Sequence, residues 1–192
     1  MRTFAAPAAL ALAWASITAC SHQNEPTNNA PLPTAAAPPY ICQYIPRHAV
    51  EQMTGLQDPL VKGSFDLEAA EGHGIGSCTI HRPNEEQEQL LEVALLVHSR
   101  RNTEEEIRLG AKRLPEIIPG SDGYYGAKQF QSENTGAVAV LNKGESTIVV
   151  DLSHEVAGRD PEADVLALMR LVAPKLIKES DTTPSPSIKR GG

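Results

Sequence analysis

Leu91-Glu92-Val93-Ala94-Leu95-Leu96-Val97-His98 occupies the middle of the 192-residue chain and has its clearest periodicity. Four large aliphatic residues alternate with a second set: Leu91, Val93, Leu95 and Val97 with Glu92, Ala94, Leu96 and His98. A period of two residues is typical of a β-strand with one buried face. The stretch therefore predicts a strand whose aliphatic row lies in the core.

Before this stretch the sequence predicts one short helix and two further strands. Pro46 suits the first position of a helix, and Gly55 suits its end. Between them, Ala49, Val50 and Met53 share one face. The apolar residues of 61–67 and of 73–80 then predict two strands, the second preceded by closely spaced glycines.

After this stretch the pattern changes to a helix, a loop, two strands and a helix. Asn102 or Thr103 is expected to cap a helix that ends at Pro115, and 119–126 to form a glycine-rich loop. Strands are expected at 137–141 and 147–152, joined by a hairpin turn at 142–145. The last helix is expected to start at Asp160-Pro161, because aspartate is a good N-cap and proline a good first residue.

Helices that bury one face against a mainly antiparallel sheet form the α+β solution. We therefore expect an α+β fold, with the helices packed on one face of the sheet as a two-layer sandwich. One domain is usual for this length, and we place it at residues 40–178.

The two ends of the chain differ from this domain in composition. Residues 1–19 resemble a signal peptide: Arg2 precedes an apolar run that is shorter than the roughly 20 residues of a membrane span. Residues 20–39 are rich in Asn, Pro, Ala and Thr and are expected to form a disordered tether. The Ser-, Thr- and Pro-rich residues 179–192 are expected to form a disordered tail.

Ile17-Thr18-Ala19-Cys20 resembles a bacterial lipobox. In that motif the chain is cut before the cysteine, and the thiol carries a diacylglycerol. We therefore expect Cys20 to be lipidated and the protein to be held at the outer face of the cell membrane, in the cell envelope. The alternative is a plain secretory signal cut at a small-residue site, with Cys20 incidental.

Cys42 and Cys78 are the cysteines that remain, and in an oxidising compartment they predict one disulfide. The loop of about 36 residues would contribute about 3 to 4 kcal/mol in the chain-entropy model. Two buried free thiols are the alternative. A metal site is a weaker one, because the sequence offers no two further ligands at a recognisable spacing.

These features together are similar to a family of actinobacterial secreted lipoproteins built on a two-cysteine domain of unknown function. In that family a lipobox and a polar linker precede a cysteine just before the first helix, and a second cysteine opens a strand. The matching positions are Cys20, Cys42 with Tyr44-Ile45, and Cys78-Thr79-Ile80. The resemblance implies a membrane-anchored, non-enzymatic protein, with a part in envelope-stress signalling for some members.

Known catalytic and cofactor patterns are missing from the sequence. The formal net charge of −7 does not suit a nucleic-acid partner. No helical metal-ligand spacing, nucleophile elbow or phosphate-binding motif occurs, so we expect no enzyme, no cofactor and no metal. The histidines His48, His73, His81, His98 and His154 show no ligand spacing, although His81 and His98 could meet across strands.

Tyr124 and Tyr125, adjacent in the glycine-rich segment, are the best binding candidates, because aromatic residues are enriched in interface hot spots. The alternative is that one ring anchors the loop on the core. Two functions remain: a module that docks on a protein partner of the envelope, or a carrier of a small apolar ligand. A lined cavity between sheet and helices would favour the carrier, and a filled core with an exposed apolar patch would favour docking.

Overall fold

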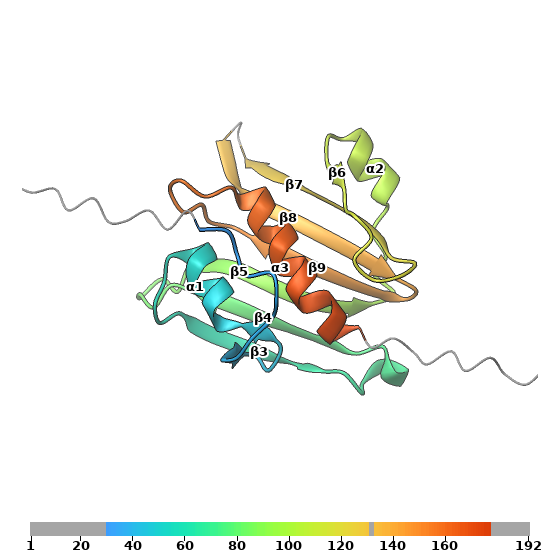
Figure 1. The fold of residues 1–192 in the computed structure, drawn as a ribbon, viewed down its shortest axis with the longest axis horizontal. Helices are drawn as coiled ribbons and strands as arrows, with labels where there is room; N and C mark the ends of the chain where they lie inside the picture. Colours follow the sequence, from blue (N-terminus) through green and yellow to red (C-terminus); the bar gives the residue numbers. More distant parts are fainter. Residues whose placement is uncertain (1–29, 131–132, 178–192) are drawn as a thin grey trace, which may run out of the picture.

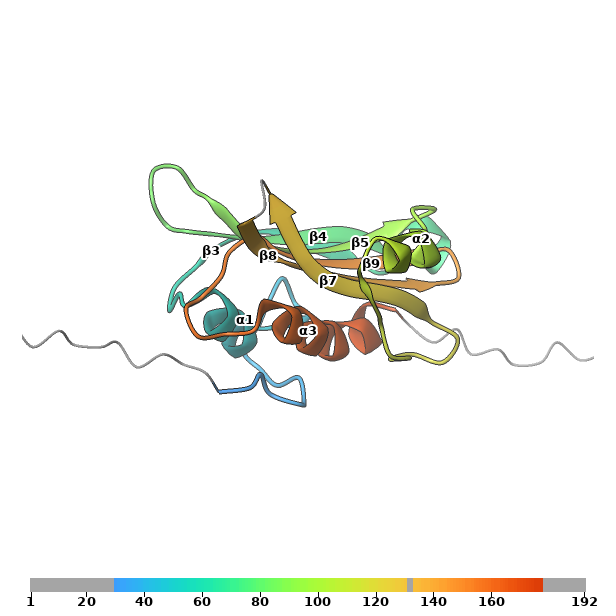
Figure 2. The same cartoon turned by 90° about the horizontal axis from the view of Figure 1, so that it is seen from above.

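The computed structural model describes residues 30–130 and 133–177, which form a sheet with helices against one face (Figures 1 and 2). Within these residues the main sheet is antiparallel with the strand order β3-β4-β5-β9-β8-β7-β6. Its strands are β3 (Leu60–Asp66), β4 (Ile75–His81), β5 (Gln89–Val97), β6 (Lys112–Arg113), β7 (Asp122–Phe130), β8 (Glu133–Lys143) and β9 (Ser146–Leu152). The α+β class with a mainly antiparallel sheet is confirmed.

Strand β5 is the central strand that the alternating stretch predicts. It pairs with β4 on one side and with β9 on the other. Leu91, Val93 and Leu95 are fully buried in the core cluster, whereas Glu92 and Leu96 of the other row are half-buried. One face of β5 therefore lies in the core and the other faces outward.

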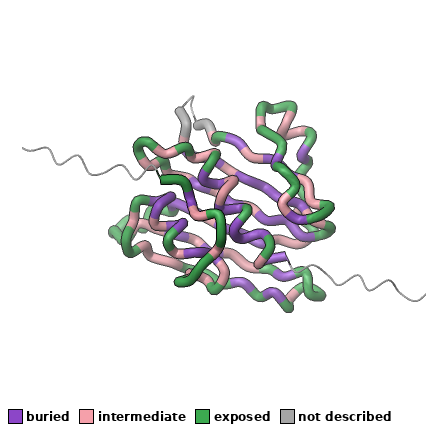
Figure 3. Tube along the Cα trace, in the orientation of Figure 1, coloured by how far each residue is buried: buried purple, intermediate pink, exposed green. Residues whose placement is uncertain are grey.

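Two helices form the layer on the core side of the sheet: α1 (Arg47–Thr54) and α3 (Pro161–Leu176) (Figure 2). As predicted, Gly55 ends α1 with a left-handed backbone. The Asp160 carboxylate caps α3 by accepting from the backbone N–H groups of Glu162 and Ala163. The inward side of α3 is fully buried at Val165, Leu168, Met169 and Val172. Figure 3 colours each residue of the trace by how far it is buried.

The expected glycine-rich loop at 119–126 is confirmed only for residues 119–121, which form a turn; Asp122–Phe130 is strand β7. Its glycines serve close packing instead of a turn. A Cβ atom on Gly123 would lie 2.0 Å from the carbonyl oxygen of Val140 on β8, and one on Gly126 would contact Ala111. The local composition resembles a loop, but the pairing with β8 requires residues without side chains.

The helix expected up to Pro115 is shorter. Asn102 does cap it, accepting from the backbone N–H of Glu105, but α2 covers only Thr103–Arg108. Gly110 then takes a positive φ of 107°, which ends the helix. Lys112–Arg113 forms β6, which pairs with β7, and α2 contacts these two strands instead of joining the layer of α1 and α3.

The hairpin turn between β8 and β9 is also narrower than expected. Asn142 pairs with Thr147, and Lys143 pairs with Ser146. The turn is therefore Gly144-Glu145, with Gly144 at a positive φ of 58°.

Residues 30–39, which we call the strap, pack on the domain and do not belong to the expected disordered tether. Leu32 is 6% exposed and belongs to the core cluster. The Arg159 Nη1 group donates to the carbonyl oxygen of Ala30 at 3.0 Å. Figure 2 shows the strap on the side of the helical layer away from the sheet. A tether can therefore extend only to residue 29; the predicted signal peptide, Cys20 and the tail 179–192 lie outside the described residues.

The strap leads into a small hairpin, β1 (Tyr40–Ile41) paired with β2 (Ile45–Pro46). Cys42 lies in the turn of this hairpin, with a positive φ of 44°. The hairpin is fixed to α1 by the backbone N–H of Arg47, which donates to the carbonyl oxygen of Pro39 at 2.9 Å.

Candidate functional site: the open face of the sheet

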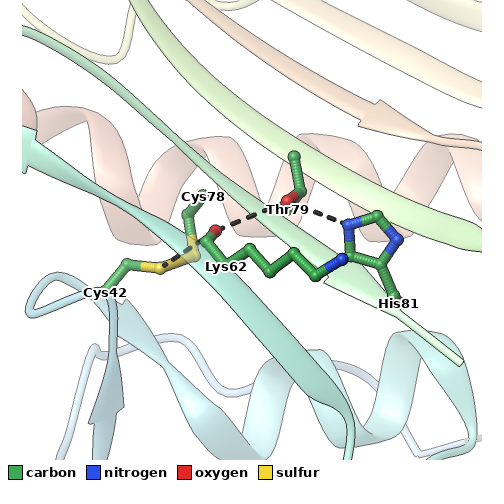
Figure 4. The surroundings of a disulfide bond; sticks show 5 residues. All are labelled: Cys42, Lys62, Cys78, Thr79 and His81. Carbon is green, nitrogen blue, oxygen red and sulfur yellow. Dashed lines mark hydrogen bonds between the residues drawn. A yellow bond between two sulfur atoms is a disulfide. The ribbon is translucent and has the colours of Figure 1, made fainter. Parts of the chain in front are cut away.

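The disulfide between Cys42 and Cys78 is confirmed (Figure 4). It joins the hairpin turn before α1 to the middle of β4, with Cα atoms 6.0 Å apart. The Cys78 side chain is fully buried. Beside it, the rings of Tyr44 and Phe65 meet edge to face, with centroids 6.0 Å apart. The bond therefore holds the start of the helical layer against the sheet.

Tyr124 and Tyr125 do not form a shared binding surface. Because they are adjacent on a strand, their rings point to opposite faces of the sheet. Tyr124 is 6% exposed, and burial, followed by the nearby Glu106 carboxylate, raises the pKa of its phenol. The Tyr125 ring packs partly against the core, with Lys112 Nζ 5.9 Å from its centroid. The two tyrosines therefore lie in a strand and not in a loop, and the burial of Tyr124 agrees with the alternative that one ring serves the core.

His73, His81 and His98 have local partners and do not form a ligand set. His81 Nδ1 lies 2.7 Å from the Gln87 carbonyl oxygen, and its Nε2 lies 3.0 Å from Thr79 Oγ1 (Figure 4). His98 does not meet His81 across the strands. Instead, His98 and His73 both approach the Glu145 carboxylate, at 3.8 and 3.3 Å. In the described part of the chain no group of three or more potential ligands is placed to hold a metal ion.

A buried polar network fixes the loop before α2. Asn142, fully buried, accepts from the backbone N–H of Arg101 and donates to its carbonyl oxygen, both at 3.2 Å. Thr103 Oγ1 in turn donates to Asp122 at 2.7 Å, and Arg100 donates to the same carboxylate at 2.6 Å. Burial raises the pKa of Asp122, but the bond from Thr103 and the charge of Arg100 outweigh it and lower the pKa below its usual value.

This network closes one border of the sheet surface that α1 and α3 leave uncovered, which we call the open face. Strand register assigns its residues, because they alternate with the core residues along each strand. Ser77 on β4 lies opposite Ala94 on β5, which lies opposite Val149 on β9. Val149 lies opposite Val140 on β8. These rows continue across the central strands of the sheet.

The centre of the open face is apolar. Leu96, Val149 and Val138 come from β5, β9 and β8 and are diagonal neighbours, a spacing at which side chains still interact. All three are half-buried. Ile75 on β4 extends this apolar stripe and is 45% exposed. One sign of the stripe is visible in the sequence: Leu96 occupies the outward row of the central strand, where a polar residue is more usual.

Polar groups border the stripe at both ends. At one end Lys128 Nζ donates to Asp151 at 2.6 Å and to Ser153 at 3.0 Å, across β7 and β9. At the other end lie His73, His98 and Glu145. An apolar centre with a polar rim is the usual anatomy of a protein interface.

The space between sheet and helices is filled by side chains. The largest of these side chains, such as Leu95, Ile148 and Met169, are fully buried. The cavities found in the described part lie at the periphery. One of about 280 Å³ lies between the strap and α3, one of about 390 Å³ borders Ile117–Pro119, and one of about 400 Å³ borders the start of α2.

No protein-family model and no curated protein matches the chain. Among the described helices, none combines the length and the apolar character needed to cross a membrane.

Proposed function

We propose that the protein is a membrane-anchored lipoprotein of the cell envelope whose domain is a non-enzymatic interaction module, and that the open face docks on a protein partner. The observation that carries the proposal is the apolar stripe of Ile75, Leu96, Val138 and Val149 on the sheet face that α1 and α3 leave uncovered. Helix α2 contacts β7 at the border of this face. Exposed apolar stripes with polar rims favour protein contact.

The filled interior supports docking over ligand transport. A carrier of a small apolar ligand needs an enclosed lined cavity, which for drug-sized ligands measures about 300 to 1,000 Å³. In the described chain, the core residues between β5, β9 and α3 are fully buried against one another. These filled positions favour docking over the carrier hypothesis.

The anchor supports the same proposal. Cys20 of the lipobox is nine residues from the Ala30 that begins the strap, counting the residues between them. The strap lies on the helical layer, and the open face is the opposite side of the sheet (Figure 2). A lipid on Cys20 would therefore hold the domain from its helical side and leave the open face accessible.

A charge placed in the stripe tests the docking surface. Leu96→Lys is expected to reduce partner capture in photo-crosslinking on intact cells by about 30-fold or more, because a central apolar anchor contributes about 2 kcal/mol or more. Leu109→Lys is the matched control: Leu109, at the end of α2, is 74% exposed and is not part of the stripe. The free energy of unfolding of both variants should stay within about 1 kcal/mol of that of the native chain.

The comparison between the two lysine variants decides the outcome. Capture that is lost in Leu96→Lys and kept in Leu109→Lys supports the open face. Capture that is equal in the two variants, with both folded, would show that the partner binds elsewhere.

A further inference from the structure

The outer surface of the helical layer has an unusual charge pattern. The strap contains no charged residue, and most of its side chains are exposed prolines, alanines and a threonine. The outward row of α3 that it borders consists of Ala163, Ala167, Arg170 and Pro174. The strap is therefore uncharged, and Arg170 is the one charged residue in the row of α3 that it borders.

Arg170 and the neighbouring Lys175 also differ from the cations around them. In the described chain Lys112 pairs with Glu162, and Arg47 pairs with Glu51. Neither Arg170 nor Lys175 has a carboxylate within ion-pair distance among the described residues; Lys175 Nζ lies 4.8 Å above the Tyr40 ring. Two cations are thus available on this surface for an external anion.

A cavity lies beside Arg170. Its volume is about 280 Å³, and the strap residues Pro31, Leu32 and Pro33 and the α3 residues Ala167 and Leu171 line it together with Arg170. Asp164 also borders it, but the buried Arg159 guanidinium neutralises that carboxylate at 2.6 and 2.7 Å. The site therefore presents an apolar hollow with one unpaired cation.

We infer that this strap face lies on the anionic surface of the membrane, with Arg170 and Lys175 against lipid phosphates. The inference depends on the proposed lipid anchor at Cys20. The ten peptide steps from Cys20 to Ala30 span at most about 35 Å when fully extended, so the strap is the part of the described chain nearest the lipid. Unpaired cations and an uncharged surface therefore lie where the membrane would be.

The overall charge of the chain also supports the inferred orientation on the membrane. A chain of net charge −7 is repelled by an anionic surface in most orientations. Each Lys or Arg near such a surface contributes about 1 kcal/mol of attraction, equivalent to about fivefold in binding. The two cations therefore favour the orientation in which the strap face meets the membrane.

The test uses the full lipidated chain in vesicles of phosphatidylcholine, with or without phosphatidylglycerol. Thr34→Cys provides a single free thiol on the strap for a bimane label, since Cys42 and Cys78 are bonded. Ser64→Cys provides the same on the open-face side of β3, and both parent residues are exposed. Brominated lipid is expected to quench the label at position 34 in anionic vesicles and to leave the label at position 64 bright.

Removal of one cation gives the second readout. Arg170→Ala is expected to reduce the docked-to-undocked ratio at position 34 about fivefold. Arg101→Ala, which removes another exposed arginine on the opposite side, is expected to leave it unchanged. A labelled chain that floats with the vesicles but is quenched equally at both positions would overturn the orientation alone. A chain that does not float would overturn the lipid anchor and the orientation with it.

Discussion

Asp164→Ala is expected to lower the free energy of unfolding by about 3 to 5 kcal/mol. Arg159 Nε and Nη2 donate to the two oxygens of Asp164 at 2.7 and 2.6 Å, and the side chains are only 4% and 8% exposed. Loss of the carboxylate would remove the bidentate acceptor of a buried guanidinium. Denaturant unfolding of the purified chain measures the effect.

The same helix provides the matched control. Glu162 also lies in the first turn of α3 and pairs with Lys112 at 2.6 Å, but the Lys112 side chain is 61% exposed. Glu162→Ala is therefore expected to cost only about 1 kcal/mol or less. Equal losses in the two variants would show that burial does not strengthen the Arg159 pair.

Loss of the disulfide is the second large effect. For the double variant Cys42→Ala, Cys78→Ala, the free energy of unfolding is expected to be about 3 to 4 kcal/mol lower than for the oxidised chain. The reason is that the bond closes a loop with a sequence separation of 36. It would also free the hairpin before α1 from β4. Thermal or denaturant unfolding of the two oxidation states and of the variant gives the comparison.

A thiol count is the control for this prediction. Denatured, unreduced chain that lacks a free thiol at Cys20 should release no reactive thiol from Cys42 or Cys78. Two reactive thiols per chain, or a reduced form as stable as the oxidised one, would contradict the role assigned to the bond. Such a result would also remove the cysteine pairing as support for the lipoprotein resemblance.

The elements with regular local signals could be predicted from the sequence. The alternation of Leu91, Val93 and Leu95 predicts β5 because these residues form one fully buried row in the core. Asp160 and Gly55 predict a helix start and a helix end, because capping depends on adjacent residues only. The cysteine pair followed from counting and from the expected compartment.

The predictions that were wrong concern segments whose structure depends on residues distant in the sequence. Gly123 marks a loop locally, but the carbonyl of Val140 on β8 leaves no space for a side chain there. The strap has a disordered composition, but Leu32 is buried in the core cluster and Arg159 binds the carbonyl of Ala30. Neither contact leaves a periodic pattern in the sequence.

The candidate site was predictable only in part. Tyr124 and Tyr125 are adjacent in the sequence, but adjacent residues on a strand face opposite sides of the sheet, and β7 is a strand where a loop was expected. The apolar stripe joins Leu96, Val149 and Val138 from three strands, so it appears only when their register is known. Leu96 alone gave a signal, and one outward leucine is too common to define a surface.

The mass of the native N-terminal peptide tests the central claim most directly, since the anchor determines where the protein acts and which face is free. The account predicts that the mature chain, isolated from membranes of its own cells, begins at Cys20 with a diacylglycerol on the thiol. It also predicts that Cys20→Ser leaves the chain unprocessed or releases it from the membrane. An unmodified N-terminus at any other residue would contradict the lipoprotein assignment.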